Sequence, residues 1–311
     1  MKIFILDPIH SIPLADANQI GEVIKWDDEE IDNISEAEAI IVRTSIIDRE
    51  RINRMPQLKI IAKHGIGTDN IDLEHAKEKG IIVTNTPTAN MESVAELVVA
   101  LTLASARKIA YSHDLTREGL DKPAPKELTG LELGGKNVGL IGTGRIGQKV
   151  GSIFSAGFNM KVYGYDPFLT EEKAKELGIV KVDTVKELLK EADVVSISVP
   201  LTKDTTNLIS MDELKQMKEN AILINTSRGK IVNEADLYIA LKEGIIRAAA
   251  LDVFEIEPPK KDNPLLSLSN FIATPHIGAA TEEALIRMGQ TAVEEIKLLM
   301  NEQTPKFIVN R

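Results

Sequence analysis

The sequence LIGTGRIGQKVG, residues 140–151, places a glycine-rich turn between an apolar run and the start of a helix-like pattern. Gly142, Gly144 and Gly147 have the spacing G-x-G-x-x-G. The first glycine of such a turn allows tight bending, the second lets a pyrophosphate approach the backbone, and the third permits close helix–strand packing. The phosphates then lie at the helix N-terminus. The pattern predicts a dinucleotide-binding unit, although three glycines alone are also typical of a plain tight turn.

An acidic residue follows at the distance expected for nucleotide binding. The next β-rich run ends in VYGYDP, which places Asp166 nineteen residues after Gly147. A carboxylate at this position can accept hydrogen bonds from the ribose hydroxyls, and it repels a 2′-phosphate. We therefore expect NAD, rather than NADP, as the cofactor.

Short β-rich runs alternate with helix-like stretches along the chain, which predicts parallel sheets covered by helices on both faces. Six runs in the second part match a doubly wound dinucleotide domain. The runs before the glycine turn are KIFILD, AEAIIVRTS, LKIIAKHG and GIIVTN, and those from the turn onwards are NVGLIG, KVYGYD, DVVSISVP, AILINTS, AAALDV and NFIATP.

A long helix-like stretch, from about Met91 to Arg117, separates the two parts. Asn90 is its candidate N-cap, and Ser93 and Glu96 have capping-box spacing. Near the end of the chain, EEALIRMGQTAVEEIKLLMN is another apolar-periodic segment, followed by too few residues for a further domain. We expect this segment to pack back on the N-terminal part. The predicted domains are residues 1–98 with 280–311, and residues 99–279.

Composition limits the function classes. A length of 311 residues corresponds to roughly two domains. The chain contains no cysteine, which excludes disulfides and cysteine-based sites and is consistent with a reducing cytoplasm. The net charge of −10 argues against non-specific nucleic-acid binding. No apolar run is long enough to span a membrane. We therefore expect a cytoplasmic protein that binds neither nucleic acid nor membrane, and we see no pattern of metal ligands.

Three chemically capable side chains follow predicted strands of the second part. Arg228 follows AILINTS, Glu257 follows AAALDVFEI, and His276 follows FIATP. Ligands of open α/β sheets bind beyond the carboxyl ends of the strands. Each residue singly is also an ordinary loop residue. Together they supply what oxidation of a hydroxy acid needs, namely a base that works near neutral pH, a carboxylate that orients it, and a guanidinium that binds a carboxylate and polarises a carbonyl.

With these residues in place, the chain resembles the D-isomer-specific 2-hydroxyacid dehydrogenases. The similar segments are GTGRIG, NTSRGKIVNEADLYIAL, AALDVFEIEPP and TPHIGAAT and, upstream, VRTS, KHGIGTDNIDLEHAKEKGIIVTNTP and SVAELVVAL. The resemblance implies two doubly wound parallel-sheet domains, with a Rossmann NAD domain inserted into a flavodoxin-like substrate domain and the active site between them. It also implies a homodimer formed largely around the nucleotide domains, to which the long helix after Met91 contributes.

The resemblance further implies roles for single residues. Arg228 would bind the substrate carboxylate and carbonyl, His276 would be the acid/base, and Glu257 would be its partner. The backbone N–H groups of Gly65, Ile66 and Gly67 would face the substrate carboxylate. On the cofactor side, the implied residues are Arg145 and Ile146 at the pyrophosphate turn, Pro200 and Thr226 along the crevice, Asp252 near the nicotinamide amide, and Gly278. Without the resemblance, GIG reads as a turn and Pro200 as a strand stop.

The substrate is less constrained. Arg43 in VRTS and Lys63 in AKHGIG could receive a phosphate, and the phosphoglycerate dehydrogenases of the family, whose short type this chain resembles, carry an arginine like Arg43. They have an arginine and a small residue where Lys63 and His64 stand, and lysine is a less geometric anion ligand than arginine. Both cations could equally be loop residues paired with nearby acids. We expect D-3-phosphoglycerate and 3-phosphohydroxypyruvate as the substrate pair, which would place the protein in serine biosynthesis.

Other activities stay open. Glyoxylate/hydroxypyruvate reductase and D-lactate dehydrogenase are alternatives, whereas formate dehydrogenase is disfavoured because that branch has Gln where Glu257 stands. The resemblance also leaves open a function that is not enzymatic. Some relatives are NAD(H)-sensing transcriptional co-repressors, which bind partners rather than turn over metabolites. The presence of all three catalytic residue types favours an enzyme.

Overall fold

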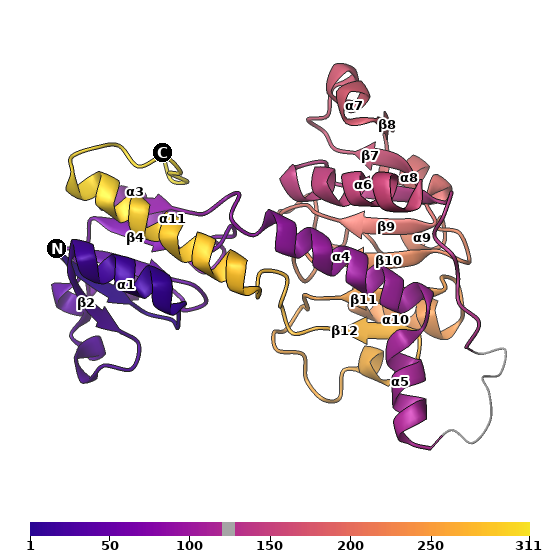
Figure 1. Cartoon of the computed structure of the whole chain (residues 1–311), viewed down its shortest axis with the longest axis horizontal. Helices are drawn as coiled ribbons and strands as arrows, with labels where there is room; N and C mark the ends of the chain where they lie inside the picture. Colours follow the sequence, from indigo (N-terminus) through magenta and orange to yellow (C-terminus); the bar gives the residue numbers. More distant parts are fainter. Residues whose placement is uncertain (120–127) are drawn as a thin grey trace. The chain divides into compact units, whose positions relative to one another are not determined.

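The computed structural model describes residues 1–119 and 128–311, and the chain forms two compact units (Figure 1). The first unit contains residues 1–93 and 279–311, and the second contains residues 94–278. The sequence placed the boundaries after residues 98 and 279. In the structure, the first boundary falls within the opening turn of helix α4 (Met91–Ala106).

The first unit is built on a five-stranded sheet in the order β2-β1-β3-β4-β5, in which all strand pairs are parallel. This is the flavodoxin-like order. Its strands are β1 (Lys2–Ile5), β2 (Glu22–Lys25), β3 (Ala39–Val42), β4 (Ile60–Lys63) and β5 (Ile82–Thr84). The sequence predicted four of these strands and missed β2. This strand reads EVIK and lies at the sheet edge, where it lacks the continuous apolar run of a central strand.

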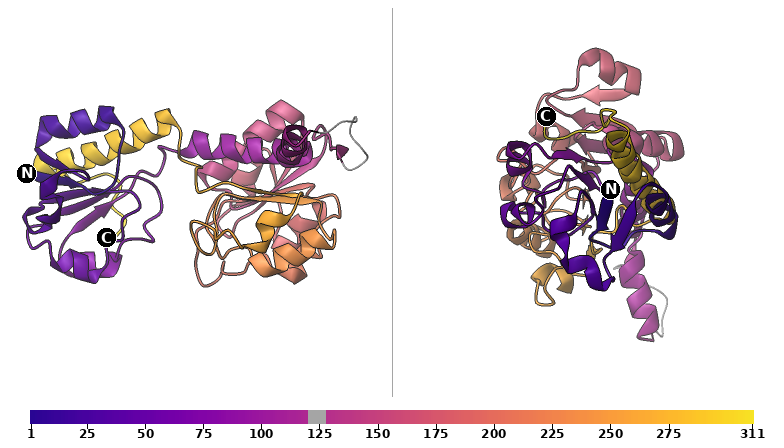
Figure 2. Two further views of the ribbon diagram at one scale, coloured as in Figure 1. Left: turned by 90° about the horizontal axis from the view of Figure 1, so that it is seen from below. Right: turned by 90° about the vertical axis from the view of Figure 1, so that its left-hand side faces the viewer.

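Helices cover both faces of this sheet. In Figure 2, α1 and the C-terminal helix α11 lie on one face and α3 lies on the other. Side chains of β1 alternate between the two cores: Ile3 and Ile5 pack with Ile296 of α11, while Phe4 packs with Ile52 of α2. The C-terminal segment thus returns to the N-terminal unit. The helices are α1 (Ser11–Ile20), α2 (Arg49–Asn53), α3 (Leu73–Glu78) and α11 (Glu282–Met300).

The second unit contains a seven-stranded, all-parallel sheet in the order β12-β11-β10-β9-β6-β7-β8. Counted from β6, this is the doubly wound 3-2-1-4-5-6 order with one further strand. The strands are β6 (Asn137–Ile141), β7 (Lys161–Tyr165), β8 (Ile179–Lys181), β9 (Val194–Ile197), β10 (Ile222–Asn225), β11 (Ala248–Leu251) and β12 (Phe271–Ala273). The sequence predicted six of them. It missed β8, which is three residues long and lies at an edge.

The predicted helix from Met91 to Arg117 is wrong as a single element. It is divided into α4 and α5 (Ile109–Arg117), because Lys108 between them adopts a left-handed backbone with φ of 52°. The capping box is also wrong, since Ser93 lies inside α4 and its hydroxyl bonds that of Thr281 at 2.6 Å. The other helices of this unit are α6 (Arg145–Phe158), α7 (Glu171–Leu177), α8 (Val185–Glu191), α9 (Met211–Leu214) and α10 (Glu234–Lys242).

Two features are absent from the described residues. No helix within them is both long and apolar enough to cross a membrane. The same residues contain no group of three or more His, Asp or Glu side chains that could hold a metal ion.

Candidate active site

The glycine turn follows β6, beside the point where the strand order of the seven-stranded sheet reverses. Gly142 has φ of 94°, and a Cβ there would lie 2.5 Å from the main-chain oxygen of Ser198. A Cβ on Gly147 would lie 2.2 Å from the oxygen of Gly142. Around Gly144, in contrast, a Cβ would meet nothing within 4 Å. Gly144 is the N-cap residue of α6, so no side chain caps the N–H groups at the start of this helix. The turn is therefore tight where it must be and open where phosphates would approach.

The acid predicted for the ribose lies against this turn. Asp166 follows β7, and its two carboxylate oxygens accept the backbone N–H groups of Thr143 and Phe168, each at 2.9 Å. The carboxylate is half-buried, so it keeps lone pairs for a ligand. The hydroxyl oxygen of Thr226 is buried and has no hydrogen-bond partner within residues 1–119 and 128–311. An open turn, an acid beside it and an unsatisfied hydroxyl fit a dinucleotide.

The other predicted cofactor residues lie on nearby loops. Arg145 and Ile146 are the first residues of α6; Arg145 is exposed and Ile146 is half-buried. Pro200 is exposed beyond β9, and its carbonyl accepts the hydroxyl of Thr205 at 2.7 Å. Arg145 and Ile146 thus lie at the turn expected to bind the pyrophosphate, and Pro200 lies beyond a strand end, where a wall of the crevice is expected.

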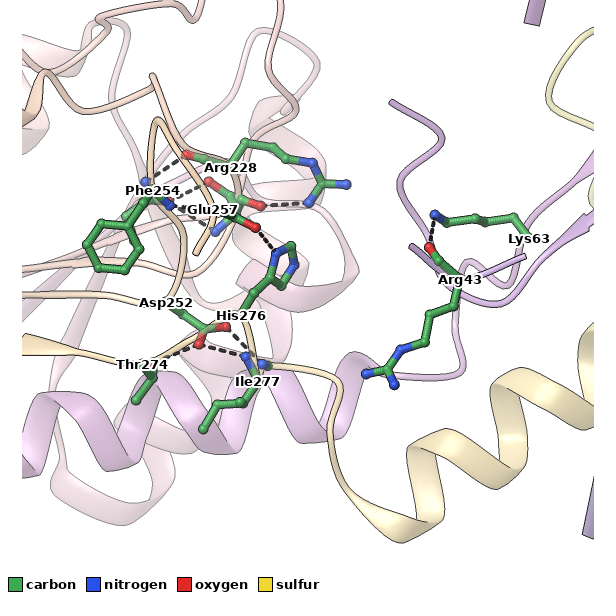
Figure 3. Close-up of polar contacts among 12 residues, drawn as sticks. Arg43, Lys63, Arg228, Asp252, Phe254, Glu257, Thr274, His276 and Ile277 are labelled. Carbon is green, nitrogen blue, oxygen red and sulfur yellow. Dashed lines mark hydrogen bonds and ion pairs between the residues drawn. The ribbon is translucent and has the colours of Figure 1, made fainter. Parts of the chain in front are cut away.

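The three predicted catalytic residues follow three neighbouring strands. Since β10, β11 and β12 are adjacent and parallel, their carboxyl ends meet at one edge of the sheet. Arg228, Glu257 and His276 come from the loops at that edge and are gathered there in Figure 3. The sequence located each loop, and the strand order brings the loops together.

His276 and Glu257 are directly bonded. Nδ1 of His276 lies 2.7 Å from Oε2 of Glu257, and the other carboxylate oxygen accepts the N–H of Phe254 at 3.1 Å. Partial burial alone would raise the pKa of Glu257. The hydrogen bond and charge of His276, the N–H of Phe254 and the positive charge of Arg228 outweigh burial, and the pKa is lowered. Glu257 is therefore a carboxylate at neutral pH, able to orient the imidazole and stabilise its protonated form.

The loop of Arg228 packs against the loop of Glu257. A Cβ on Gly229 would lie 1.9 Å from the oxygen of Phe254, so only glycine permits this approach. Asn225, at the end of β10, accepts the N–H of Ser227 at 3.0 Å and donates to the carbonyl of Arg228 at 2.9 Å. The sequence-based prediction missed Asn225. Its signal was an Asn at a strand end two residues before the Ser of NTSRG, the spacing of an Asx-turn.

Asp252 has a different environment from the expected one near a nicotinamide amide. It is fully buried, and its carboxylate accepts the hydroxyl of Thr274 at 2.6 Å and the N–H groups of Ile277 and Gly278 at 2.8 Å each. Its carbonyl accepts the N–H of His276 at 2.8 Å. Asp252 therefore holds the His276 loop. The N–H of Gly278, which the sequence assigned to the cofactor side, is used inside the protein.

In the first unit, the GIG loop follows β4. The N–H of Gly65 donates to the hydroxyl of Thr86 at 3.1 Å. The N–H groups of Ile66 and Gly67 have no partner among the described residues. Asn85 fixes the loop by donating to the carbonyl of Ile66 at 2.8 Å. Two of the three predicted donors are thus available to a ligand.

The two predicted phosphate ligands differ. The Arg43 side chain extends from its loop (Figure 3), and its guanidinium has no hydrogen bond or ion pair in the described part of the chain. Lys63 is 7% exposed, and its ammonium donates to the carbonyl of Arg43 at 2.5 Å and to Asn70 Oδ1 at 2.6 Å. Burial, followed by the charge of Arg43, lowers the pKa of His64 to about 4, so this side chain is neutral. Lys63 and His64 are interior residues here, which leaves Arg43 as the candidate anion ligand.

The parallel sheet, glycine turn and strand-end acid define a Rossmann dinucleotide-binding domain. Residues 99–278 match the family model described as the NAD binding domain of D-isomer specific 2-hydroxyacid dehydrogenases. The chain belongs to this family, and its cofactor is of the NAD type.

Relatives within the family carry different names. The chain is 44% identical to a D-3-phosphoglycerate dehydrogenase of Methanocaldococcus jannaschii, in an alignment that covers all of this chain and 59% of that protein. It is 38% identical to a glyoxylate reductase of Korarchaeum cryptofilum, in an alignment that covers all of this chain and 96% of that protein. A D-lactate dehydrogenase of Aquifex aeolicus, solved with NAD and lactic acid, has a TM-score of 0.87 and 32% identity, with 100% of this chain and 99% of that chain covered. The chain spans less than three-fifths of two curated phosphoglycerate dehydrogenases that it matches, 59% and 56% of their lengths.

Proposed function

We propose that this protein is an NAD-dependent oxidoreductase that interconverts a D-2-hydroxy acid and its 2-oxo acid. The observation that carries the proposal is the 2.7 Å bond between His276 Nδ1 and Glu257 Oε2, with Arg228 on the next strand end of a dinucleotide-binding sheet. An acid/base pair, a carboxylate-binding cation and a nicotinamide cofactor are together sufficient for this reaction.

Each residue has a role that follows from its position and its hydrogen bonds. Since Nδ1 of His276 is bonded to Glu257, Nε2 is the atom that exchanges a proton with the substrate oxygen. Arg228 binds the substrate carboxylate and polarises the carbonyl. The N–H groups of Ile66 and Gly67 have no partner among the described residues and are further candidate donors to a carboxylate. Bound NAD supplies the hydride acceptor or donor.

The proposed substrate pair is D-3-phosphoglycerate and 3-phosphohydroxypyruvate. Two observations support it: the unpaired guanidinium of Arg43 among the described residues, and similarity along the whole chain to phosphoglycerate dehydrogenases. Glyoxylate/hydroxypyruvate reduction is the second candidate, favoured by the coverage of 96% of a glyoxylate reductase. We further propose that Asp166 selects NAD over NADP, because a carboxylate at this position repels a 2′-phosphate.

We also propose that the protein is a homodimer that associates through its nucleotide-binding unit. Ile109 opens α5 with 55% of its surface exposed, and no residue of α5 is buried in the single chain. An uncovered helix of this kind is typical of a surface that a partner covers. Light scattering should give twice the mass of the 34.1 kDa chain, and Ile109→Asp should weaken association. A monomeric wild type would contradict the proposal.

The function is tested by following NADH oxidation with 3-phosphohydroxypyruvate, hydroxypyruvate, glyoxylate, pyruvate and branched 2-oxo acids. We expect the highest kcat/KM with 3-phosphohydroxypyruvate. A higher value with hydroxypyruvate or glyoxylate would reassign the substrate and leave the reaction class intact. NADH binding without turnover of any 2-oxo acid would reject the enzyme in favour of an NAD(H)-sensing protein.

A further inference from the structure

The loop that carries Arg43 is held by an unusually complete set of hydrogen bonds. Residues 43–45 follow β3, whose neighbour in the sheet is β1, at the point where the strand order of the first unit reverses. Three N–H groups and two carbonyls of this short loop are bonded to side chains of other segments. A loop that makes so few local main-chain bonds depends on those side chains for its conformation.

Asp7, directly after β1, binds one side of the loop. Its carboxylate accepts the N–H of Arg43 at 2.6 Å, of Thr44 at 3.0 Å and of Ser45 at 3.1 Å. It also accepts the two hydroxyls of Thr44 and Ser45, at 2.9 and 2.8 Å. Burial would raise the pKa of Asp7, but these donors outweigh it and the pKa is lowered. The ionised carboxylate is therefore the form that the loop requires.

Lys63 and Asn70 bind the other side. Lys63 donates to the carbonyl of Arg43, and Asn70 donates to the carbonyl of Ser45 at 2.6 Å. The two side chains also bond each other, through Lys63 Nζ and Asn70 Oδ1. In Figure 3 the Lys63 ammonium meets the main chain of Arg43, while the guanidinium of Arg43 points elsewhere. The lysine is therefore committed to the loop rather than presented to a ligand.

We propose that Asp7, Lys63 and Asn70 are positioning residues that hold Arg43 ready to bind a second anionic group of the substrate, of the phosphate type. In this arrangement Lys63 does not touch the substrate. The proposal rests on the function proposed above and deepens it. Binding an anion with a side chain on a pre-ordered loop loses less entropy than ordering the loop at the moment of binding.

A double-mutant cycle separates positioning from direct contact. The measured quantity is the kcat/KM for 3-phosphohydroxypyruvate divided by that for hydroxypyruvate. Arg43→Gln should lower this ratio about tenfold to a hundredfold, the loss of one charge-assisted contact. Lys63→Met should lower the ratio about tenfold when it is made in the wild type, but less than about twofold when it is made in Arg43→Gln. The reason is that losing Lys63 misplaces the Arg43 side chain, which has no effect once that side chain has been replaced. Independent, additive losses would show that Lys63 binds the phosphate itself and would overturn the proposal.

Lys59→Met is the matched control, because Lys59 also belongs to this sheet region but forms an exposed ion pair with Glu38. It should leave the ratio unchanged. A Lys63→Met ratio equal to that of wild type would likewise overturn the positioning role. Thermal melting of each variant identifies those that are unfolded, and Asp7→Asn serves as a second variant of the same network.

Amide hydrogen exchange tests the loop without any substrate. The N–H groups of residues 43–45 should be protected in the wild type, and their exchange should accelerate at least about tenfold in Asp7→Asn and Lys63→Met. Fast exchange in the wild type would overturn the proposal whatever the activity. If exchange behaves as expected but Arg43→Gln leaves the ratio unchanged, anion selection by Arg43 fails while the held loop stands. Turnover of hydroxypyruvate judges the proposed reaction class separately.

Discussion

His276 and Glu257 lie nineteen residues apart in the chain, yet Nδ1 of the imidazole and Oε2 of the carboxylate are 2.7 Å apart. They meet because β11 and β12 are neighbours in the sheet and their loops leave the same edge. Asp252, at the end of β11, holds the His276 loop by accepting the N–H groups of Ile277 and Gly278. The pair is therefore supported from both strands.

The pair predicts a pH dependence. Reduction of a 2-oxo acid needs protonated His276, so its rate should fall as pH rises, and oxidation should rise over the same range. In Glu257→Gln, the charged acceptor of the His276 ring is lost, so the pH profile of the reductive reaction should no longer superimpose on that of the wild type. The measurement is kcat/KM against pH in both directions.

Two results bear on this pairing. Glutamine preserves the shape of the side chain, and the lowered pKa of Glu257 keeps the wild-type residue ionised throughout the neutral range. A Glu257→Gln profile that superimposes on the wild type would therefore refute the pairing. His276→Ala should lose about 10²–10⁴-fold in turnover in both directions and keep NADH binding, whereas loss of binding as well would indicate a folding defect.

Cofactor choice should depend on Asp166. The wild type is expected to prefer NADH, and Asp166→Ser should narrow the difference between NADH and NADPH by about tenfold or more, since it removes both a ribose acceptor and a charge that repels the 2′-phosphate. The measurement is kcat/KM for each cofactor at saturating substrate. Equal use of both cofactors by the wild type would contradict this role for the acid.

Gly229 should tolerate no side chain. Its Cβ would lie 1.9 Å from the oxygen of Phe254, so Gly229→Ala must displace the loop that carries Glu257. We expect a loss of about 1–3 kcal/mol in the free energy of unfolding together with a lower kcat. Gly157→Ala is the control, because that glycine lies inside α6, where an added Cβ would meet nothing within 4 Å, and it should be neutral or slightly stabilising. Equal stability and kcat in both variants would show that the two loops need not approach.

His64 predicts a stability that depends on pH. Its Nε2 donates to the carbonyl of Leu285 at 3.2 Å, its Nδ1 is buried without a described partner, and burial lowers its pKa from 6.5 to about 4. As pH falls, His64 takes up a proton in the unfolded state before it does so in the folded state. The contribution of neutral His64 to the free energy of unfolding is therefore fully present above pH 6.5 and is lost as pH falls from 6.5 towards 4. The loss is on the order of 3 kcal/mol over this window.

Urea unfolding at a series of pH values tests this expectation. His64→Gln is the informative variant, because its amide can still donate to Leu285 but does not titrate. The slope of unfolding free energy against pH in this window should be smaller in His64→Gln than in the wild type. Identical slopes in the two proteins would mean that His64 is not the group responsible.

Sequence periodicity and motifs by themselves determined the central strands, the glycine turn and the loops that carry the candidate site residues. The apolar runs of the central strands, the glycine spacing and the loop positions of Arg228, Glu257 and His276 are local properties, because each depends on residues close together in the chain. The missed strands β2 and β8 are edge strands with little apolar signal, and they form because a neighbouring strand supplies their hydrogen bonds. The break between α4 and α5 depends on one left-handed residue, Lys108, whose side chain carries no sequence signal for it.

Only the tertiary structure decided which polar groups face a ligand and which are used inside the protein. Lys63, Asp252 and the N–H of Gly65 are each chemically suitable for binding, yet each is bonded to a group from a distant segment: Arg43 for the first, Ile277 for the second and Thr86 for the third. Sequence specifies the donor or acceptor but not its partner. Since a buried polar group must be hydrogen-bonded, the packing of segments far apart in the chain determines which of these groups stay free to act.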